Sequence, residues 1–289
     1  MNTELANMNP NYVQAWHTAG PISIFAFISY FLLYLLGHQG QPHVVSKFYM
    51  IKKLTMLKWA ALISAATYGI TVLLWFVGLY SKVMVERGMM EAPASPDLVA
   101  PMFITQFFSP VVAGLIFAAV MAAIMSTSEA FLLVASSAIV RDLYQQIIKK
   151  GEQLPAKKEL ALSRLVTLGV ILLTVLLSLN PPDLVGWLGN ASWGIFVASL
   201  VPVLSIGIWW KRATRPAAIW SASLGFLTSF GLYILKVKEV YVPQLDTGAI
   251  ALIVSTVTLI AVSFLTRPEP NERFDNAMSD RVSEDARAS

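Results

Sequence analysis

SPVVAGLIFAAVMAAIMSTSEAFLLVASSAIVRD, residues 109–142, is the stretch of sequence that decides the fold. Between Val111 and Val140 it holds no basic residue and one acid, so it is long enough for a tilted membrane-spanning helix. Small residues recur along it at four-residue spacing, which lets neighbouring helix backbones approach closely. Its centre, Ser126-Thr127-Ser128-Glu129, is polar, and such groups are costly against lipid. The pattern predicts a helix surrounded by other protein, with a polar group held at its centre.

The composition of the whole chain indicates the same class. Of its 289 residues, 56% are hydrophobic and 13% are charged, whereas soluble domains average about 45–50% apolar and about 25% charged residues. With several apolar runs of about 20 residues, the chain is predicted to be an all-α integral membrane protein. It has no cysteine, which excludes disulfides and thiolate metal sites. Basic loops on one membrane side account for the excess of basic residues, so no nucleic acid partner is expected.

Seven membrane spans are expected within residues 21–266, which form one transporter-like unit. The first span is interrupted by residues 37–43, GHQGQPH, where two glycines and a proline predict a broken helix or a helix end that lines a cavity. Residues 97–108, between the second and third spans, are expected to form a short helix at the membrane interface. The seven expected spans cover about residues 21–36, 59–80, 109–142, 160–179, 184–210, 216–235 and 249–265.

The basic residues set the expected orientation. Seventeen of the 21 lysines and arginines lie in or beside the loops of one membrane side. The positive-inside rule therefore places the N-terminus outside and the C-terminus inside. Residues 1–20 are then an extracellular segment, and the mixed-charge, apolar-poor residues 267–289 are expected to form a disordered cytoplasmic tail. Because the N-terminus is expected outside and has no signal-peptide pattern, the chain is interpreted as a fragment or as one half of a split gene.

Polar residues within the third span are the first candidates for a site. Ala123, Ser126 and Thr127 stand at i, i+3 and i+4 and so share a helix face, where two hydroxyls and a carbonyl suit a small cation. Their alternative role is local, because Ser and Thr in membrane helices commonly bond a carbonyl of the preceding turn. Glu129 is a functional candidate because a carboxylate near mid-bilayer is costly, whether it is protonated, paired or exposed to water.

Four further residues are candidates in the first and fifth spans. Tyr34 and His38 are four residues apart and share a face that runs into the interruption. Asn190 and Trp193 lie in a glycine-rich part of the fifth span, and helix packing is the alternative role for all four residues.

The three histidines raise the alternative of an enzyme or a haem protein within the membrane. His38 and His43 are five residues apart and do not form a same-face metal pair, and no other paired spacing occurs. An intramembrane enzyme or haem protein that uses His17, His38 and His43 is therefore a rival interpretation with no ligand pair to support it.

Two motifs resemble a known family. GQPHVVSKF (residues 40–48) and AGLIFAAVMAAIMSTSEAFLLVASSAIVRDLY (residues 113–144) look like the sodium:solute symporter family, closest in pattern to its sodium/proline branch. The stretch from Asn180 to WWKRATRPAA is also similar to that family. The resemblance covers nearly the whole chain but only the family's C-terminal portion. It implies a LeuT-type fold of two inverted repeats, of which this chain supplies the second, core helices six to ten, plus two extra helices.

The resemblance implies roles for the residues of the third span. Ala123 matches a backbone-carbonyl ligand of a co-transported sodium ion, and Ser126 and Thr127 match its two hydroxyl ligands. The remaining ligands would come from core helix one, in the missing repeat. Glu129 stands where some relatives also carry an acid, which implies a candidate second cation or proton site.

The resemblance carries over to the substrate only in part. The proline branch has a Trp and a Tyr where this chain has Tyr34 and His38, so a different small solute, such as an anionic one, is expected. Asn190 and Trp193 on core helix ten are further substrate candidates.

The interpretation from sequence is sodium-coupled secondary active symport of a small organic solute across the cell membrane. Neither catalytic residues nor an organic cofactor is expected. The expected partners are the solute, the lipid bilayer and a separate chain that supplies the first repeat. The alternative is a symporter-like sensory module without transport, against which the short polar tail argues, because it holds no signalling domain.

Overall fold

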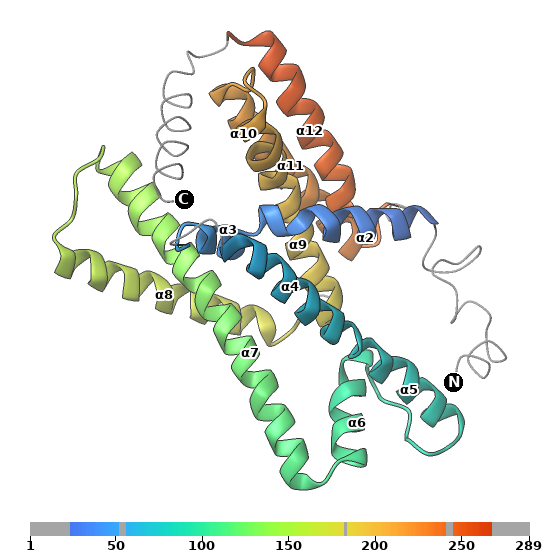
Figure 1. The fold of residues 1–289 in the computed structure, drawn as a ribbon. Coiled ribbons are helices and arrows are strands. Elements are labelled where there is room, and N and C mark those ends of the chain that lie inside the picture. Colours follow the sequence, from blue (N-terminus) through green and yellow to red (C-terminus); the bar gives the residue numbers. More distant parts are fainter. Residues whose placement is uncertain (1–23, 52–55, 182–183, 241–244, 268–289) are drawn as a thin grey trace. The chain divides into compact units, whose positions relative to one another are not determined.

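Helices make up all the regular secondary structure that the computed structural model describes, which is residues 24–51, 56–181, 184–240 and 245–267 (Figure 1). The all-α prediction is confirmed for these residues. The expected extracellular segment 1–20, with His17, and residues 268–289 of the expected tail lie outside the described residues.

Six helices in the described part of the chain are long and apolar enough to cross a membrane. The apolar segment Ile24–Gly40 is shorter than these six, so the seventh crossing stays a prediction. The six helices are Met56–Glu86, Pro110–Ile148, Ala156–Ser178, Val185–Trp209, Arg215–Val237 and Thr247–Leu265.

The described residues divide into two compact units, one of residues 42–188 and the other of residues 24–41 together with residues 189–267. The first unit contains the elements from α3 to α8. These are α3 (Pro42–Phe48), α4 (Met56–Val72), α5 (Trp75–Glu86), η3 (Pro96–Leu98), α6 (Val99–Phe107), α7 (Pro110–Ser137), the π-helical η4 (Ala138–Ile148) and α8 (Ala156–Ser178). The short helix expected over residues 97–108 is present as η3 and α6, and its place at the interface stays a prediction.

Helix α7 is the long helix predicted from the third span. Ser109 precedes it with extended backbone and Pro110 occupies its first turn, where a missing N–H has no cost. The helix passes without a gap into η4, so the two together run to Ile148 and not to residue 142 as expected. At 1.5 Å per residue this length is about 58 Å, about twice the bilayer core of about 30 Å, so one end must project beyond the hydrocarbon.

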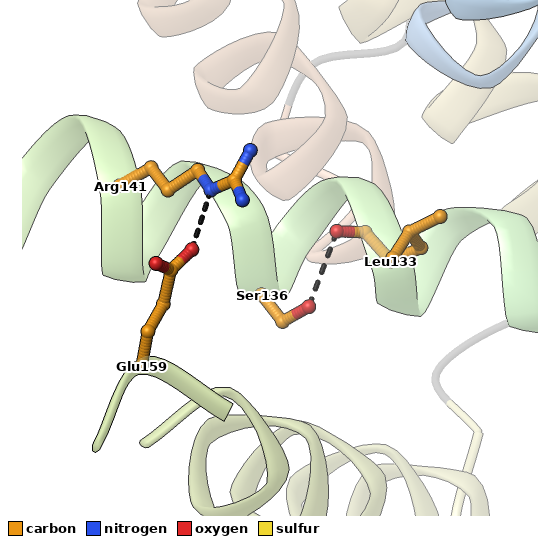
Figure 2. A network of polar contacts seen from close by, with 4 residues as sticks. All are labelled: Leu133, Ser136, Arg141 and Glu159. Atoms are coloured by element: carbon orange, nitrogen blue, oxygen red, sulfur yellow. Dashed lines mark hydrogen bonds and ion pairs between the residues drawn. The ribbon is translucent and has the colours of Figure 1, made fainter. Parts of the chain in front are cut away.

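An ion pair links η4 to the start of α8. The Arg141 side chain donates from Nε to the Glu159 carboxylate at 2.7 Å (Figure 2). The turn reverses through Lys150 and Gly151, which have φ of 52° and 91°. Glycine adopts such left-handed backbone without steric cost, which makes it a common stop after a helix.

The second unit is built around α9 (Val185–Val201), from its residue 189 onward. At Pro202, α9 becomes the π-helical η5 (Pro202–Ile206) and then α10 (Gly207–Trp209). Around these lie α2 (Ile24–Gly37) with the 3₁₀ turn η2 (His38–Gly40), α11 (Arg215–Val237) and α12 (Thr247–Leu265). The buried apolar core of this unit consists of Leu33, Val197, Val201, Ala249 and Leu252.

Small residues allow α9, α11 and α12 to pack at backbone distance. Helices α11 and α12 run side by side (Figure 1), and the buried Ser221 hydroxyl donates to the Ser255 carbonyl across them at 2.8 Å. A Cβ atom on Gly225 of α11 would lie 2.3 Å from the Ala198 carbonyl oxygen of α9. Such close approach is available only to residues without a side chain, so Gly225 sets the distance between α9 and α11.

A substitution at Gly225 tests this packing. We expect Gly225→Ala to lower the free energy of unfolding by about 1–3 kcal/mol, because the added methyl group overpacks the contact with α9. The measurement is thermal unfolding of the detergent-solubilised chain. Gly231→Ala is the matched control in the same helix, since a Cβ there meets nothing within 4 Å. Equal unfolding temperatures for the two variants would contradict the packing described.

Candidate functional site

Three oxygens gather on one face of α7, at the residues predicted to bind sodium. The Ser126 hydroxyl donates to the Ala123 carbonyl at 3.0 Å, and the Thr127 hydroxyl donates to the same carbonyl at 3.1 Å. These are the local bonds to the preceding turn that were the alternative interpretation. They also place three hard oxygen atoms within one small cluster.

The spacing of this cluster suits a shared cation. Oxygens that bind a hard cation at about 2.3–2.6 Å, at right angles to one another, are separated by about 3.3–3.7 Å. The observed separations of 3.0 and 3.1 Å need only a small increase to reach that range. The two hydroxyls would then turn their protons away and present lone pairs, as the carbonyl already does.

The face of α7 that carries these oxygens is exposed. Every residue from Ala118 to Glu129 is exposed, whereas Ala113 and Ser136 on the same helix are buried. Glu129 forms no ion pair with any described residue. A run of hydroxyls and a carboxylate is costly against lipid, so this face calls for a cover of protein or water.

The interruption predicted after the first span is a real break in the helix. Helix α2 ends at Gly37, η2 forms one 3₁₀ turn, and α3 starts at Pro42, whose ring removes a backbone donor. The Gln39 side chain accepts a hydrogen bond from the Ser205 hydroxyl of η5. Gly40 is buried against α9, where a Cβ would lie 2.8 Å from Val201. Side chain and backbone contacts therefore hold the break against α9 and η5.

Trp193 holds the end of α2 most directly. Its indole Nε1–H donates to the Leu33 carbonyl at 3.2 Å. The indole occupies the space beside Gly37, where a Cβ would lie 2.1 Å from Nε1. Because its one polar hydrogen is used within the protein, Trp193 can offer a solute only the face or edge of its ring.

The other substrate candidates surround this indole. Tyr34 lies with its ring centroid 5.8 Å from that of Trp193, and His38 meets Trp193 edge to face at 5.1 Å. The Tyr34 hydroxyl donates to the Asn190 side-chain oxygen. This bond directs the Asn190 amide nitrogen, which carries two hydrogens and no lone pair for acceptance, away from Tyr34. The structure thus brings the four substrate candidates into one cluster.

Asp246 is a residue beside this cluster that the sequence reasoning missed. It precedes α12, where its carboxylate accepts from the Gly248 N–H at 2.8 Å, and a Cβ on Gly194 would lie 3.7 Å from the same oxygen. Burial raises the pKa of Asp246, and its charge acts on Tyr30 and Tyr34 of α2. An Asp immediately before an apolar run is a recognisable N-cap signal, but sequence alone does not show which helices lie beside it.

The histidines do not form a metal site in the described part of the chain. His43 of α3 packs its ring on Phe131 of α7, with centroids 4.3 Å apart, whereas His38 packs on Trp193. Among the described residues, no group of three His, Asp or Glu side chains is placed to hold a metal ion.

Comparison with known proteins places this arrangement in a family. The model of the sodium:solute symporter family matches residues 1–225. The chain belongs to this family. The predicted resemblance is thereby confirmed, and with its six long apolar helices this symporter-family chain is a multi-pass protein of the cell membrane.

Individual relatives are named as transporters. The chain is similar to a sodium/pantothenate symporter of Haemophilus influenzae, with 29% identity over 257 residues, which cover 87% of the chain and 52% of the relative. It is 30% identical over 226 residues to an osmoregulated proline transporter of Bacillus subtilis, covering 78% and 44%. It is 32% identical over 226 residues to a sodium/proline symporter of Staphylococcus aureus, covering 75% and 42%. The chain thus spans about half the length of these relatives, and no solved structure matches it.

The role of Trp193 gives a prediction about the break. We expect Trp193→Phe to speed amide hydrogen exchange in residues 38–41 roughly two- to tenfold, because the ring remains while a hydrogen bond of about 0.5–1.5 kcal/mol is lost. The measurement is hydrogen exchange followed by mass spectrometry of the chain in lipid nanodiscs. Trp220→Phe, an exposed position on α11, is the control. Unchanged exchange in Trp193→Phe, or the same acceleration in both variants, would show that the indole does not hold the break.

Proposed function

We propose that this chain takes part in sodium-coupled secondary active symport of a small organic solute. The observation that carries the proposal is the cluster of three oxygens from Ala123, Ser126 and Thr127 on the exposed face of α7. Membership of a family named for sodium-coupled transport supports it. The names of the relatives, which include sodium/proline and sodium/pantothenate symporters, support it as well.

In this proposal sodium takes the place of the two local hydrogen bonds, and both hydroxyls keep their protons. The Ala123 carbonyl keeps its place, and the Ser126 and Thr127 hydroxyls rotate so that three oxygens face the ion. Three ligands are fewer than a hard cation takes in a protein site, so further oxygens come from another helix. Sodium then stabilises the conformation in which both sets of ligands are together, and this differential affinity couples the ion to the solute.

The helix that completes the site comes from outside the described residues. The exposed run from Ala118 to Glu129 has small residues at four-residue spacing and a polar end, which suits a helix interface in a membrane. The buried Gln41 at the end of the break has a side-chain nitrogen without a hydrogen-bond partner among the described residues. Both features fit a first repeat of a LeuT-type transporter, supplied by a longer form of this polypeptide or by a separate chain, with this chain as core helices six to ten and two extra helices.

Seven crossings fit this architecture. The interrupted first span is the seventh crossing in this proposal, and its break stands where a transporter places its binding site. The distribution of basic residues supports an N-terminus outside and a C-terminus inside.

The solute in this proposal is small and carries an acceptor group, such as a carboxylate. The Asn190 amide nitrogen, oriented by Tyr34, can donate hydrogen bonds to such a group. Trp193 forms a wall, because its N–H is bonded to Leu33. Tyr34 and His38 differ from the Trp and Tyr of the proline branch, which favours a small anionic solute other than proline.

Glu129 is proposed as a second cation or proton site. It lies two residues beyond Thr127 on an exposed part of α7, so a carboxylate there either pairs with a group from the missing cover or binds a proton.

The alternative function is a sensory module that binds the solute without moving it. Such a module would keep solute binding at Asn190 and lack uptake that depends on a sodium gradient. The same uptake measurement therefore separates the two functions.

Removal of one hydroxyl tests the sodium site. We expect Ser126→Ala or Thr127→Ala, in the transporter assembled with its first repeat, to raise the sodium concentration for half-maximal uptake about tenfold or more. The reason is the loss of one ion–oxygen contact, worth about 1.5–3 kcal/mol by analogy with hydrogen bonds to charged groups. Uptake of labelled solute at varied external sodium is the measurement.

The matched control for this test is Thr174→Ala on α8. Thr174 also donates to the carbonyl of its own preceding turn, Val170, at 2.8 Å and is exposed, but it belongs to no oxygen cluster. We expect its sodium dependence to equal that of the unmodified protein. Unchanged sodium dependence in both α7 variants would remove these residues from the site.

A further inference from the structure

Asp246 is a carboxylate beside the solute cluster that the proposed function does not use. It precedes α12 and accepts a hydrogen bond from the Gly248 N–H at 2.8 Å. Helices α9 and α12 approach at backbone distance there, because a Cβ on Gly194 would lie 2.9 Å from the Gly248 Cα atom. The same Cβ would lie 3.7 Å from the Asp246 Oδ1 atom. The glycine contact therefore places the carboxylate against α9.

The face of α9 that meets Asp246 also carries Asn190. Asn190 and Gly194 are four residues apart, so they lie one above the other on the helix. The Tyr34 hydroxyl donates to the Asn190 side-chain oxygen, and the charge of Asp246 also acts on Tyr34. The carboxylate thus meets α9 about one helical turn from the amide that is proposed to bind the solute. These residues belong to one compact unit.

Burial is the main influence on the charge of Asp246. Burial raises the pKa of its carboxyl group, whereas the N–H groups at the start of α12 and the positive charge of Lys236 act in the opposite direction. The other titratable groups that it acts on are Tyr30 and Tyr34 of α2, and α9 contains none. A second negative charge next to this carboxyl group would raise its pKa further.

We propose that Asp246 binds a proton together with an anionic solute. The solute carboxylate accepts hydrogen bonds from the Asn190 amide nitrogen, and a proton taken up from water by Asp246 removes the repulsion between the two negative charges. This inference rests on the proposed function, because it concerns the same solute cluster. It accounts for a carboxylate at the edge of a site for an anion.

Proton binding and solute binding then strengthen each other by the same factor. The pKa of Asp246 is higher in the solute-bound protein than in the free protein. The affinity for the anion therefore rises as the pH falls through the bound-state pKa, and it levels off below the pKa of the free protein.

Equilibrium binding of labelled pantothenate, a small carboxylate, tests this linkage in the transporter assembled with its first repeat. Between about pH 8 and about pH 5.5 this probe stays ionised. We expect its affinity at saturating sodium to rise about tenfold over that range. Asp246→Asn keeps an acceptor for the Gly248 N–H. This variant should bind pantothenate with nearly constant affinity, close to that of the unmodified protein at low pH.

His38→Gln is the matched control, because His38 contacts the Trp193 indole in the same cluster and histidine is titratable in this pH range. We expect this variant to keep the pH dependence, whatever its effect on the affinity itself. A pH dependence that survives in Asp246→Asn, or that disappears in His38→Gln, would overturn the inference and leave sodium-coupled symport standing. Binding that depends on Asp246 but not on sodium would support the inference and contradict the proposed function.

Infrared difference spectroscopy of the same assembled protein follows the proton itself. As the pH falls, the carboxyl band of protonated Asp246, which Asp246→Asn lacks, should appear above the ordinary range of an Asp side chain, about pH 3.9. Pantothenate should move its appearance to higher pH. A band that appears only in the ordinary range, or that pantothenate leaves unmoved, would overturn the inference.

Discussion

A membrane helix must give every polar group a partner other than lipid, and this constraint governs α7. Its centre carries Ser126, Thr127 and Glu129 on a helix that is mainly apolar. The two hydroxyls find a hydrogen-bond partner within their own helix, because both donate to the Ala123 carbonyl. That solution uses both hydroxyl protons but leaves oxygen lone pairs pointing outward from an exposed face. In the proposed function, a sodium ion and a covering helix give these oxygens the partners that lipid does not supply.

The second unit meets the same constraint by close packing around α9. Gly194 and Ala198 let α12 and α11 approach its backbone, and Trp193 bonds the end of α2. The break after Gly37 would expose backbone carbonyls and amides if it faced lipid. Held against α9 and η5, it becomes a fixed feature, with Tyr34, His38 and Asn190 around the indole.

The sequence predicts the parts of this chain that depend on composition and spacing. The α7 helix, the break at residues 37–43 and the common face of Ala123, Ser126 and Thr127 all follow from apolar length, glycine and proline, and the 3.6-residue period. The continuation of α7 through η4 to Ile148 was not predicted. In the sequence, Arg141 and Asp142 indicate the end of a membrane span, and the pairing of Arg141 with Glu159 is visible only in the structure. The bond from Trp193 to Leu33 and the position of Asp246 beside Gly194 depend on which helices pack together. A single sequence carries no signal for those long-range neighbours.

The central claim is that Ala123, Ser126 and Thr127 form part of a sodium site whose other ligands lie outside the described residues. Equilibrium binding of radioactive sodium tests it most directly, with the purified chain alone and with the chain assembled with a first repeat. The account predicts saturable binding only in the assembled protein, and its loss when Ser126 and Thr127 are both replaced by Ala. Saturable binding that survives this double replacement would contradict the account.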